Sequence, residues 1–245
     1  AIKSMIKTDA IFDEDEVLNL HDSLGITNAQ VSFDIEIVTS TYGYTRIYSD
    51  PVRAGDSKLR LKSYTQSNET KLLSYSNKLQ TEGILIEFDR SMIIDWLKDN
   101  NIISDNSVPP SGREKEWFLQ NIDPGLVECY GEIDNATEHA ITKHVYGLIH
   151  TISHMMIRAA GEISGLSKDS LSEIVLPNIP AIFIYANTSQ AIPLGSLSGM
   201  FEKRYKDFLD KALELSKDCI FDPLCSNATG ACSGCTYLRD VSCSN

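Results

Sequence analysis

The sequence predicts an α+β fold: a mixed sheet, a central helix buried on two faces, and a small four-cysteine zinc module at the end. Three observations carry this prediction. They are a strand-like alternation from residue 31, a helical stripe between residues 135 and 160, and five cysteines in the last 27 residues. The expected parts are an acidic N-terminal arm (1–30), a strand-rich subdomain (31–108), an α/β core (114–218) and a zinc-binding tail (219–245).

Period-two alternation places the strands in the first half of the chain. Apolar residues at 31, 33, 35 and 37 alternate with mostly polar ones, which predicts a half-buried strand that breaks or bulges at Gly43. A weak strand is expected at 58–62 and a buried one at 83–89. Ser91 is expected to cap the helix that follows, and residues 100–113 read as an exposed loop.

The central helix is expected from about Asn135 to Ala160. At 100° per residue its apolar side chains fall in two stripes, so the helix is expected to lie between two layers. The first stripe holds Ile141, Val145, Leu148, Ile149, Ile152 and Met156, and the second holds His139, Tyr146, His150, His154 and Ile157.

The second half continues with shorter elements. We expect a short helix capped by Ser167 and ending near Glu173, then a buried strand at 181–186. A loop is expected at 195–199, and an amphipathic helix then leads into Cys219.

The tail carries its cysteines in the spacing C-x5-C-x6-C-x2-C-x7-C. A C-x2-C pair on one turn suits tetrahedral zinc, and a structural site needs four ligands. Cys232 and Cys235 form the C-x2-C pair, and the other two ligands come from Cys219, Cys225 and Cys243. The predicted ligands of a structural zinc ion are Cys219, Cys225, Cys232 and Cys235, with Cys243 in place of Cys219 or Cys225 as the alternative. With the predicted set, Cys243 would lie beside the ion or outside the site, and the isolated Cys129 is expected to be a small buried hydrophobe.

Two alternatives to zinc remain for these cysteines. A disulfide framework would leave one of the five unpaired and suits a secreted binding protein, whereas clustered cysteines in a cytosolic chain favour metal. An iron–sulfur cluster is the second alternative. Zinc is preferred because a loop-rich tail with few apolar residues needs a stabilising energy of the order of 10–16 kcal/mol, which structural zinc provides in small peptides.

His150 and His154 are four residues apart, so both imidazoles project from one side of the helix. Zinc hydrolases use this spacing with a glutamate between the histidines, but here the intervening residues are Thr, Ile and Ser. Glu173 could supply a third ligand or a base, which would make a metal-dependent nuclease or hydrolase. The commoner interpretation is a buried polar seam in which the histidines hydrogen-bond to Glu173 or Tyr185.

Charge and missing motifs narrow the function classes. A formal net charge of −12 disfavours DNA binding through the electrostatic field of the whole protein. Contact with DNA therefore requires a local basic patch or a partner protein. There are two candidate basic patches, residues 58–62 and the cluster Lys203, Arg204 and Lys206. Each is more simply explained as an ordinary solvent-exposed face of a strand or helix. No phosphate-binding loop, dinucleotide turn or nucleophile elbow is present, which favours a non-enzyme. No membrane span or signal peptide is apparent either, and a cytoplasmic setting is expected.

Several short strings resemble one known family. They are His150–His154, Leu171–Ile174, Ile184–Tyr185, Gly195–Gly199 and the tail cysteines with Asp222–Cys225 and Gly230–Cys232. The chain resembles the helicase-associated zinc-binding family of formally unknown function, found at the C-termini of Mrf-type DNA-repair helicases and in DrmB of the DISARM anti-phage system. The C-x5-C gap is similar to the DrmB-like branch. The resemblance, over about residues 31–245, implies a zinc-binding accessory protein that works with a superfamily-two helicase on DNA, in phage defence or repair.

Overall fold

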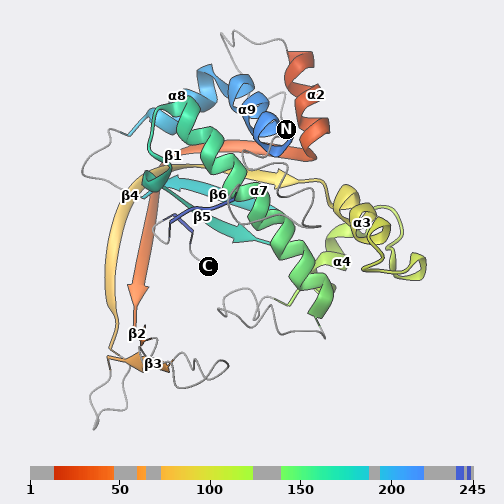
Figure 1. Ribbon diagram of the computed structural model, residues 1–245, viewed down its shortest axis with the longest axis horizontal. Coiled ribbons are helices and arrows are strands. Elements are labelled where there is room, and N and C mark those ends of the chain that lie inside the picture. The colour runs from red at the N-terminus through yellow and green to blue at the C-terminus, as the bar shows by residue number, and fades with distance from the viewer. Residues whose placement is uncertain are drawn as a thin grey trace, which may run out of the picture. The chain divides into compact units, whose positions relative to one another are not determined.

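The computed structural model describes residues 14–46, 60–64, 73–123, 139–187, 194–217, 236–239 and 242–243. The chain divides into two compact units (Figure 1). The larger comprises Ala1–Ile35 and Thr81–Asn245, and the smaller is Glu36–Gln80. The four predicted zinc ligands and Cys129 lie outside the described residues.

A four-stranded sheet runs in the order β1-β4-β6-β5. Its strands are β1 (Ile26–Thr41), β4 (Tyr75–Phe88), β5 (Leu171–Leu176) and β6 (Ala181–Ala186). Strand β6 pairs antiparallel with both β4 and β5, where the sequence analysis expected a mixed sheet. The combination of helices and a separate antiparallel sheet confirms the α+β class.

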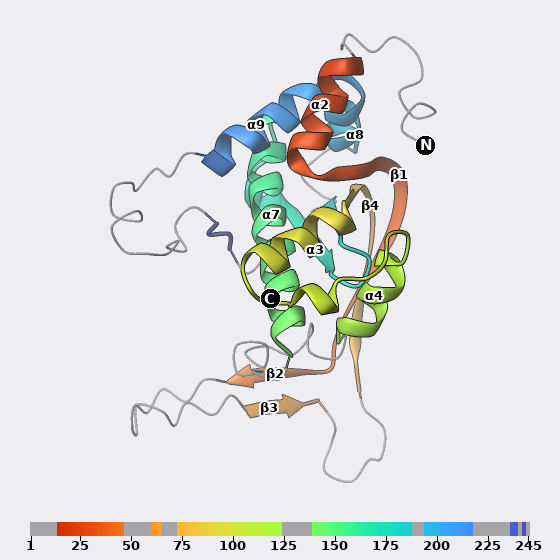
Figure 2. The same cartoon turned by 90° about the vertical axis from the view of Figure 1, so that its right-hand side faces the viewer.

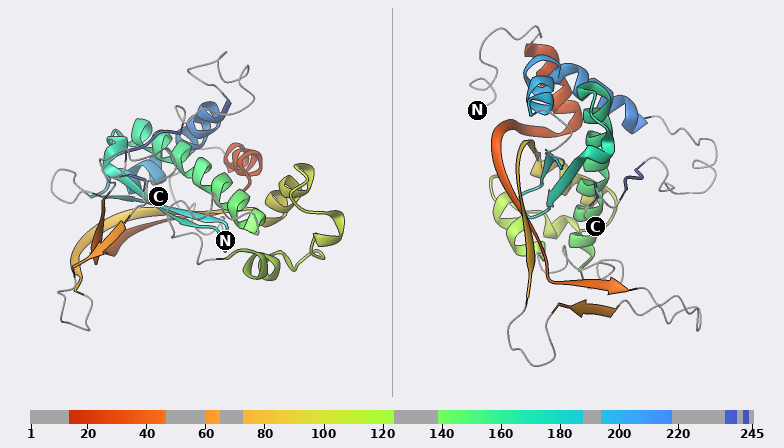
Figure 3. Two further views of the ribbon diagram at one scale, coloured as in Figure 1. Left: turned by 60° about the horizontal axis from the view of Figure 1, so that its bottom comes forward. Right: turned by 90° about the vertical axis from the view of Figure 1, so that its left-hand side faces the viewer.

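The central helix α7 (Ala140–Ser164) packs against β5, β6, α8 (Ser196–Lys203) and α9 (Tyr205–Lys217) (Figures 1 and 3). Both predicted stripes are represented in the core, because Val145, Ile149 and Met156 of the first and Tyr146 and Ile157 of the second are buried. The helix is therefore two-faced, as predicted. It ends at Gly165, whose φ of 78° is in the left-handed region that glycine adopts readily.

The remaining helices surround this centre (Figure 2). Helix α2 (Glu14–Leu24) packs against α9, and α3 (Arg90–Asp99) contacts α4 (Glu114–Asn121) and α7. No helix within the described ranges is long and apolar enough to cross a membrane.

Three local expectations need correction. Asp89, not Ser91, caps α3, because its carboxylate accepts hydrogen bonds from the backbone N–H groups of Ser91 (2.7 Å) and Met92 (3.2 Å). Ser167 caps only the 3-10 turn η3 (Lys168–Ser170), after which the chain enters β5 instead of continuing as a helix. The expected loop at 195–199 is the start of α8. The loop expected at 100–113 is confirmed between α3 and α4, and it contains the 3-10 turn η1 (Asp105–Ser107).

The smaller unit contains residues 36–41 of β1 and residues 75–80 of β4. The Glu36–Lys78 ion pair and a 2.6 Å hydrogen bond between Ser40 and Ser76 link the two strands. Strand β2 (Gly43–Arg46) pairs antiparallel with β3 (Arg60–Ser63), which confirms the break at Gly43 and the weak strand near 58–62.

Candidate metal centre

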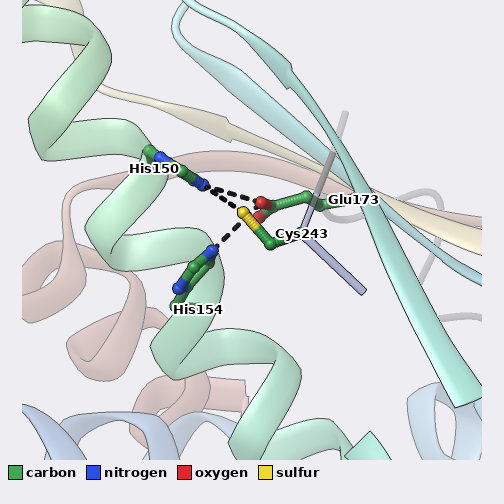
Figure 4. Close-up of side chains that lie close together, drawn as sticks. All are labelled: His150, His154, Glu173 and Cys243. Carbon is green, nitrogen blue, oxygen red and sulfur yellow. Dashed lines mark hydrogen bonds and ion pairs between the residues drawn. The ribbon is translucent and has the colours of Figure 1, made fainter. Parts of the chain in front are cut away.

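Two histidines on α7 form the first half of the candidate site. His150 and His154 are one helical turn apart, with ring centroids 4.4 Å from each other and ring planes at 81°. Figure 4 shows both imidazoles pointing away from the helix toward the same carboxylate and thiol. The i, i+4 spacing places them together, as expected.

Glu173 supplies the carboxylate from β5 rather than from a helix. Its side chain is fully buried, and its Oε1 lies 2.9 Å from His150 Nε2 and 3.1 Å from His154 Nε2. The predicted contact between the histidines and Glu173 is therefore confirmed. A carboxylate buried to this extent requires positive charge around it.

The pKa values of these groups follow from their mutual contacts. Burial opposes the charge of Glu173, but hydrogen bonds with His150, His154 and Ser153 outweigh it and lower the pKa to about 2. Burial likewise opposes charge on the histidines. Contacts with Cys243 and Glu173 outweigh it and raise the pKa of His150 to about 9 and of His154 to about 10. Positive charge is thus strongly favoured beside Glu173.

Cys243 completes the group from the far end of the chain. Its Sγ lies 3.3 Å from His150 Nε2. The four donor atoms, one each from His150, His154, Glu173 and Cys243, all lie within 4.8 Å of one another. We call this group the His–Glu–Cys cluster. From the sequence, Cys243 is expected beside or outside a metal site, with no link to the histidines. The one hint in the sequence that Cys243 has a separate role is that it is the fifth cysteine of the tail, one more than a four-ligand site uses.

The C-terminal segment, residues 236–239 and 242–243, covers this cluster. The Thr236 carbonyl accepts a hydrogen bond from His154 Nδ1, and Ser242 Oγ donates to the Lys168 carbonyl at 2.9 Å. Leu238 is buried. These contacts hold the segment beside the histidines, whose side chains remain 21% (His150) and 11% (His154) exposed.

The cluster has the donors of a metal site. Two imidazole nitrogens, one carboxylate oxygen and one sulfur suit zinc, which accepts all three kinds of ligand and prefers four in a tetrahedron. A catalytic zinc site keeps one position for water, whereas four protein donors form a closed, structural site.

Comparison with known proteins finds a relative among the curated proteins. No family model matches the chain. The chain is 25% identical over 178 residues to the DISARM protein DrmB of Bacillus paralicheniformis, a match that covers 66% of this chain and 29% of that protein. The chain thus spans less than a third of the length of the relative it matches.

Proposed function

We propose that the chain is a non-catalytic accessory part of a DISARM-type antiviral defence protein that docks on a superfamily-two helicase and assists it on DNA. The observation that carries this proposal is the similarity to DrmB across 66% of the chain. A zinc-stabilised tail formed by Cys219, Cys225, Cys232 and Cys235 is part of the proposal.

The charges of the described residues favour docking over independent DNA binding. Arg204 and Lys206 belong to one of the candidate basic patches, yet both are ion-paired: Arg204 with Asp207 at 3.0 Å, and Lys206 with Asp210 at 2.8 Å and Glu16 at 3.4 Å. Their charge is largely compensated within the protein. Because the net charge of −12 repels the DNA phosphates, we infer that a partner protein supplies the DNA contact.

The test is co-expression with a superfamily-two helicase from the same genome, followed by affinity purification and an unwinding assay. We expect the two proteins to co-purify and the helicase to hold DNA more tightly in the complex than alone. The same purification after treatment with a strong zinc chelator should yield less complex. Absence of a complex under all conditions, with both partners folded, would refute the accessory role.

A metal-dependent nuclease is the second candidate, because His150, His154 and Glu173 do converge. The thiol of Cys243 and the overlying C-terminal segment argue against it, since they occupy the space that water and substrate would need. Incubation of labelled DNA with the protein and zinc or manganese discriminates the two functions. Cleavage that His154→Gln abolishes while the fold is retained would establish the nuclease.

A further inference from the structure

We propose that the His–Glu–Cys cluster binds a structural zinc ion, separate from the four-cysteine tail site, which clamps the C-terminal segment onto α7 and β5. This inference does not depend on the accessory role. It rests on the convergence of donors, on the orientation of His154 and on the attachment of the C-terminal segment.

The donor spacing suits a tetrahedral ion. With zinc–ligand bonds of about 2.0–2.3 Å, neighbouring donors in a tetrahedron lie roughly 3.3–3.6 Å apart. The described distances are 2.9 Å from His150 Nε2 to Glu173 Oε1, 3.1 Å from His154 Nε2 to the same oxygen, and 3.3 Å from His150 Nε2 to Cys243 Sγ. The donors need to separate by only a few tenths of an ångström at these contacts to admit the ion.

His154 is oriented as metal-binding histidines are. Its Nδ1 donates to the Thr236 carbonyl, and its Nε2 faces the other donors. A backbone carbonyl bound to one ring nitrogen fixes the tautomer and directs the lone pair of the other nitrogen at the metal. Figure 4 shows the same convergence for His150, whose ring approaches from one turn earlier on α7.

The ligands come from three parts of the chain that are distant in sequence. The histidines are on α7, Glu173 is on β5, and Cys243 lies 93 residues after His150. The other described contacts of the C-terminal segment are hydrogen bonds of Thr236 and Ser242, the burial of Leu238, and an Arg239–Asp169 ion pair of 3.3 Å whose Arg239 side chain is 69% exposed. A metal bond to Cys243 would therefore provide the strongest attachment of this segment.

A purely hydrogen-bonded cluster is the competing interpretation, and counting metal ions in variants of the full chain separates the two. We expect Cys243→Ser and His154→Gln each to lose about one zinc ion per chain relative to the wild type. His139→Gln, which changes an exposed histidine at the start of the same helix, should lose none. Retention of the wild-type count in both cluster variants would overturn the proposal.

Cobalt(II) substitution identifies the ligands. In a protein with Cys219, Cys225, Cys232 and Cys235 all changed to serine, the remaining site should bind cobalt(II) with a tetrahedral spectrum and charge transfer from a single thiolate. Failure to bind cobalt(II) in this folded background would overturn the proposal. If instead Cys235→Ser and Cys243→Ser in the native background each remove the same single ion, Cys243 belongs to the tail site and the proposal is wrong.

Limited proteolysis tests the clamp itself. Trypsin cleaves after arginine, and Arg239 is exposed just before Cys243. We expect zinc-loaded protein to keep residues 240–245 at least tenfold longer than chelator-treated protein, as measured by intact mass, and Cys243→Ser to abolish the difference. Equal cleavage rates with and without zinc would show that no ion holds the segment.

Discussion

Glu82 offers the sharpest test of how the core is assembled. This buried residue of β4 accepts three hydrogen bonds from the start of α8: Oε1 from the Leu197 N–H at 3.0 Å, and Oε2 from the Ser198 N–H at 3.1 Å and the Ser198 hydroxyl at 2.6 Å. A carboxylate at this position also interacts favourably with the positive end of the helix dipole.

Replacing Glu82 with glutamine preserves the shape but removes one acceptor oxygen and the negative charge. At least one buried donor loses its partner, which costs about 1–3 kcal/mol, and the lost interaction with the dipole adds about 0.3–1 kcal/mol. We therefore expect Glu82→Gln to lower the free energy of unfolding by about 2–3 kcal/mol at pH 7. Urea titration followed by the fluorescence of Trp96 and Trp117 measures this change.

The effect has a defined pH dependence. Burial alone would raise the pKa of Glu82, but the hydrogen bonds from Ser198, Leu197 and Gly195 together lower it below its ordinary value of 4.5. The folded state therefore favours the charged form. The stabilisation is fully present above about pH 4.5 and is lost as the pH falls through the depressed pKa of the folded state.

The difference between wild type and Glu82→Gln should consequently shrink in acid. The control is Glu202→Gln, which changes an exposed residue of α8, the helix whose start Glu82 contacts. Its free energy of unfolding should stay within about 0.5 kcal/mol of the wild type. The reasoning would be refuted if Glu82→Gln were as stable as the wild type at pH 7, or if the difference widened as the pH fell.

Four further substitutions test the packing. A Cβ at Gly83 would lie 2.9 Å from the Ile184 carbonyl oxygen, so Gly83→Ala should lower the free energy of unfolding by about 1–3 kcal/mol in the same urea titration. A Cβ at Gly147 of α7 would lie in open space, so Gly147→Ala should be neutral or stabilising by up to about 1 kcal/mol. Phe208→Ala removes a fully buried ring and should cost about 3–5 kcal/mol, so a change in thermal midpoint of only a degree would contradict its place in the core. Tyr205→Phe removes the hydroxyl that lies 2.8 Å from buried His21 Nε2, and it should lower the free energy of unfolding by about 1–3 kcal/mol. Chemical denaturation measures this change, and an unchanged midpoint would mean that water replaces the hydroxyl.

The sequence predicts elements whose signals are local. Strand β6 has the predicted bounds, 181–186, because an uninterrupted apolar run follows Pro180. The two-faced character of α7 follows from its helical periodicity. By contrast, α4 has only eight residues and buries Trp117 and Phe118 side by side, which gives no periodic pattern to detect.

The remaining errors involve partners that are distant in sequence. The start of α8 reads as a glycine-containing loop, and its stabilising acceptor, Glu82, lies more than 100 residues earlier. Ser167 is a good cap, but the pairing of β5 with β6 prevails over continuation of a helix. The candidate site shows the same limit: the His150–His154 spacing is visible in sequence, whereas the approach of Cys243 depends on how the C-terminal segment returns to α7.

The central structural claim is that a zinc ion lies among His150, His154, Glu173 and Cys243. Anomalous scattering at the zinc absorption edge, from crystals of the zinc-loaded full chain, tests it most directly. We expect an anomalous peak about 2.0–2.3 Å from His150 Nε2, His154 Nε2, Glu173 Oε1 and Cys243 Sγ. Density showing these four side chains hydrogen-bonded to one another, with no anomalous peak between them, would contradict it.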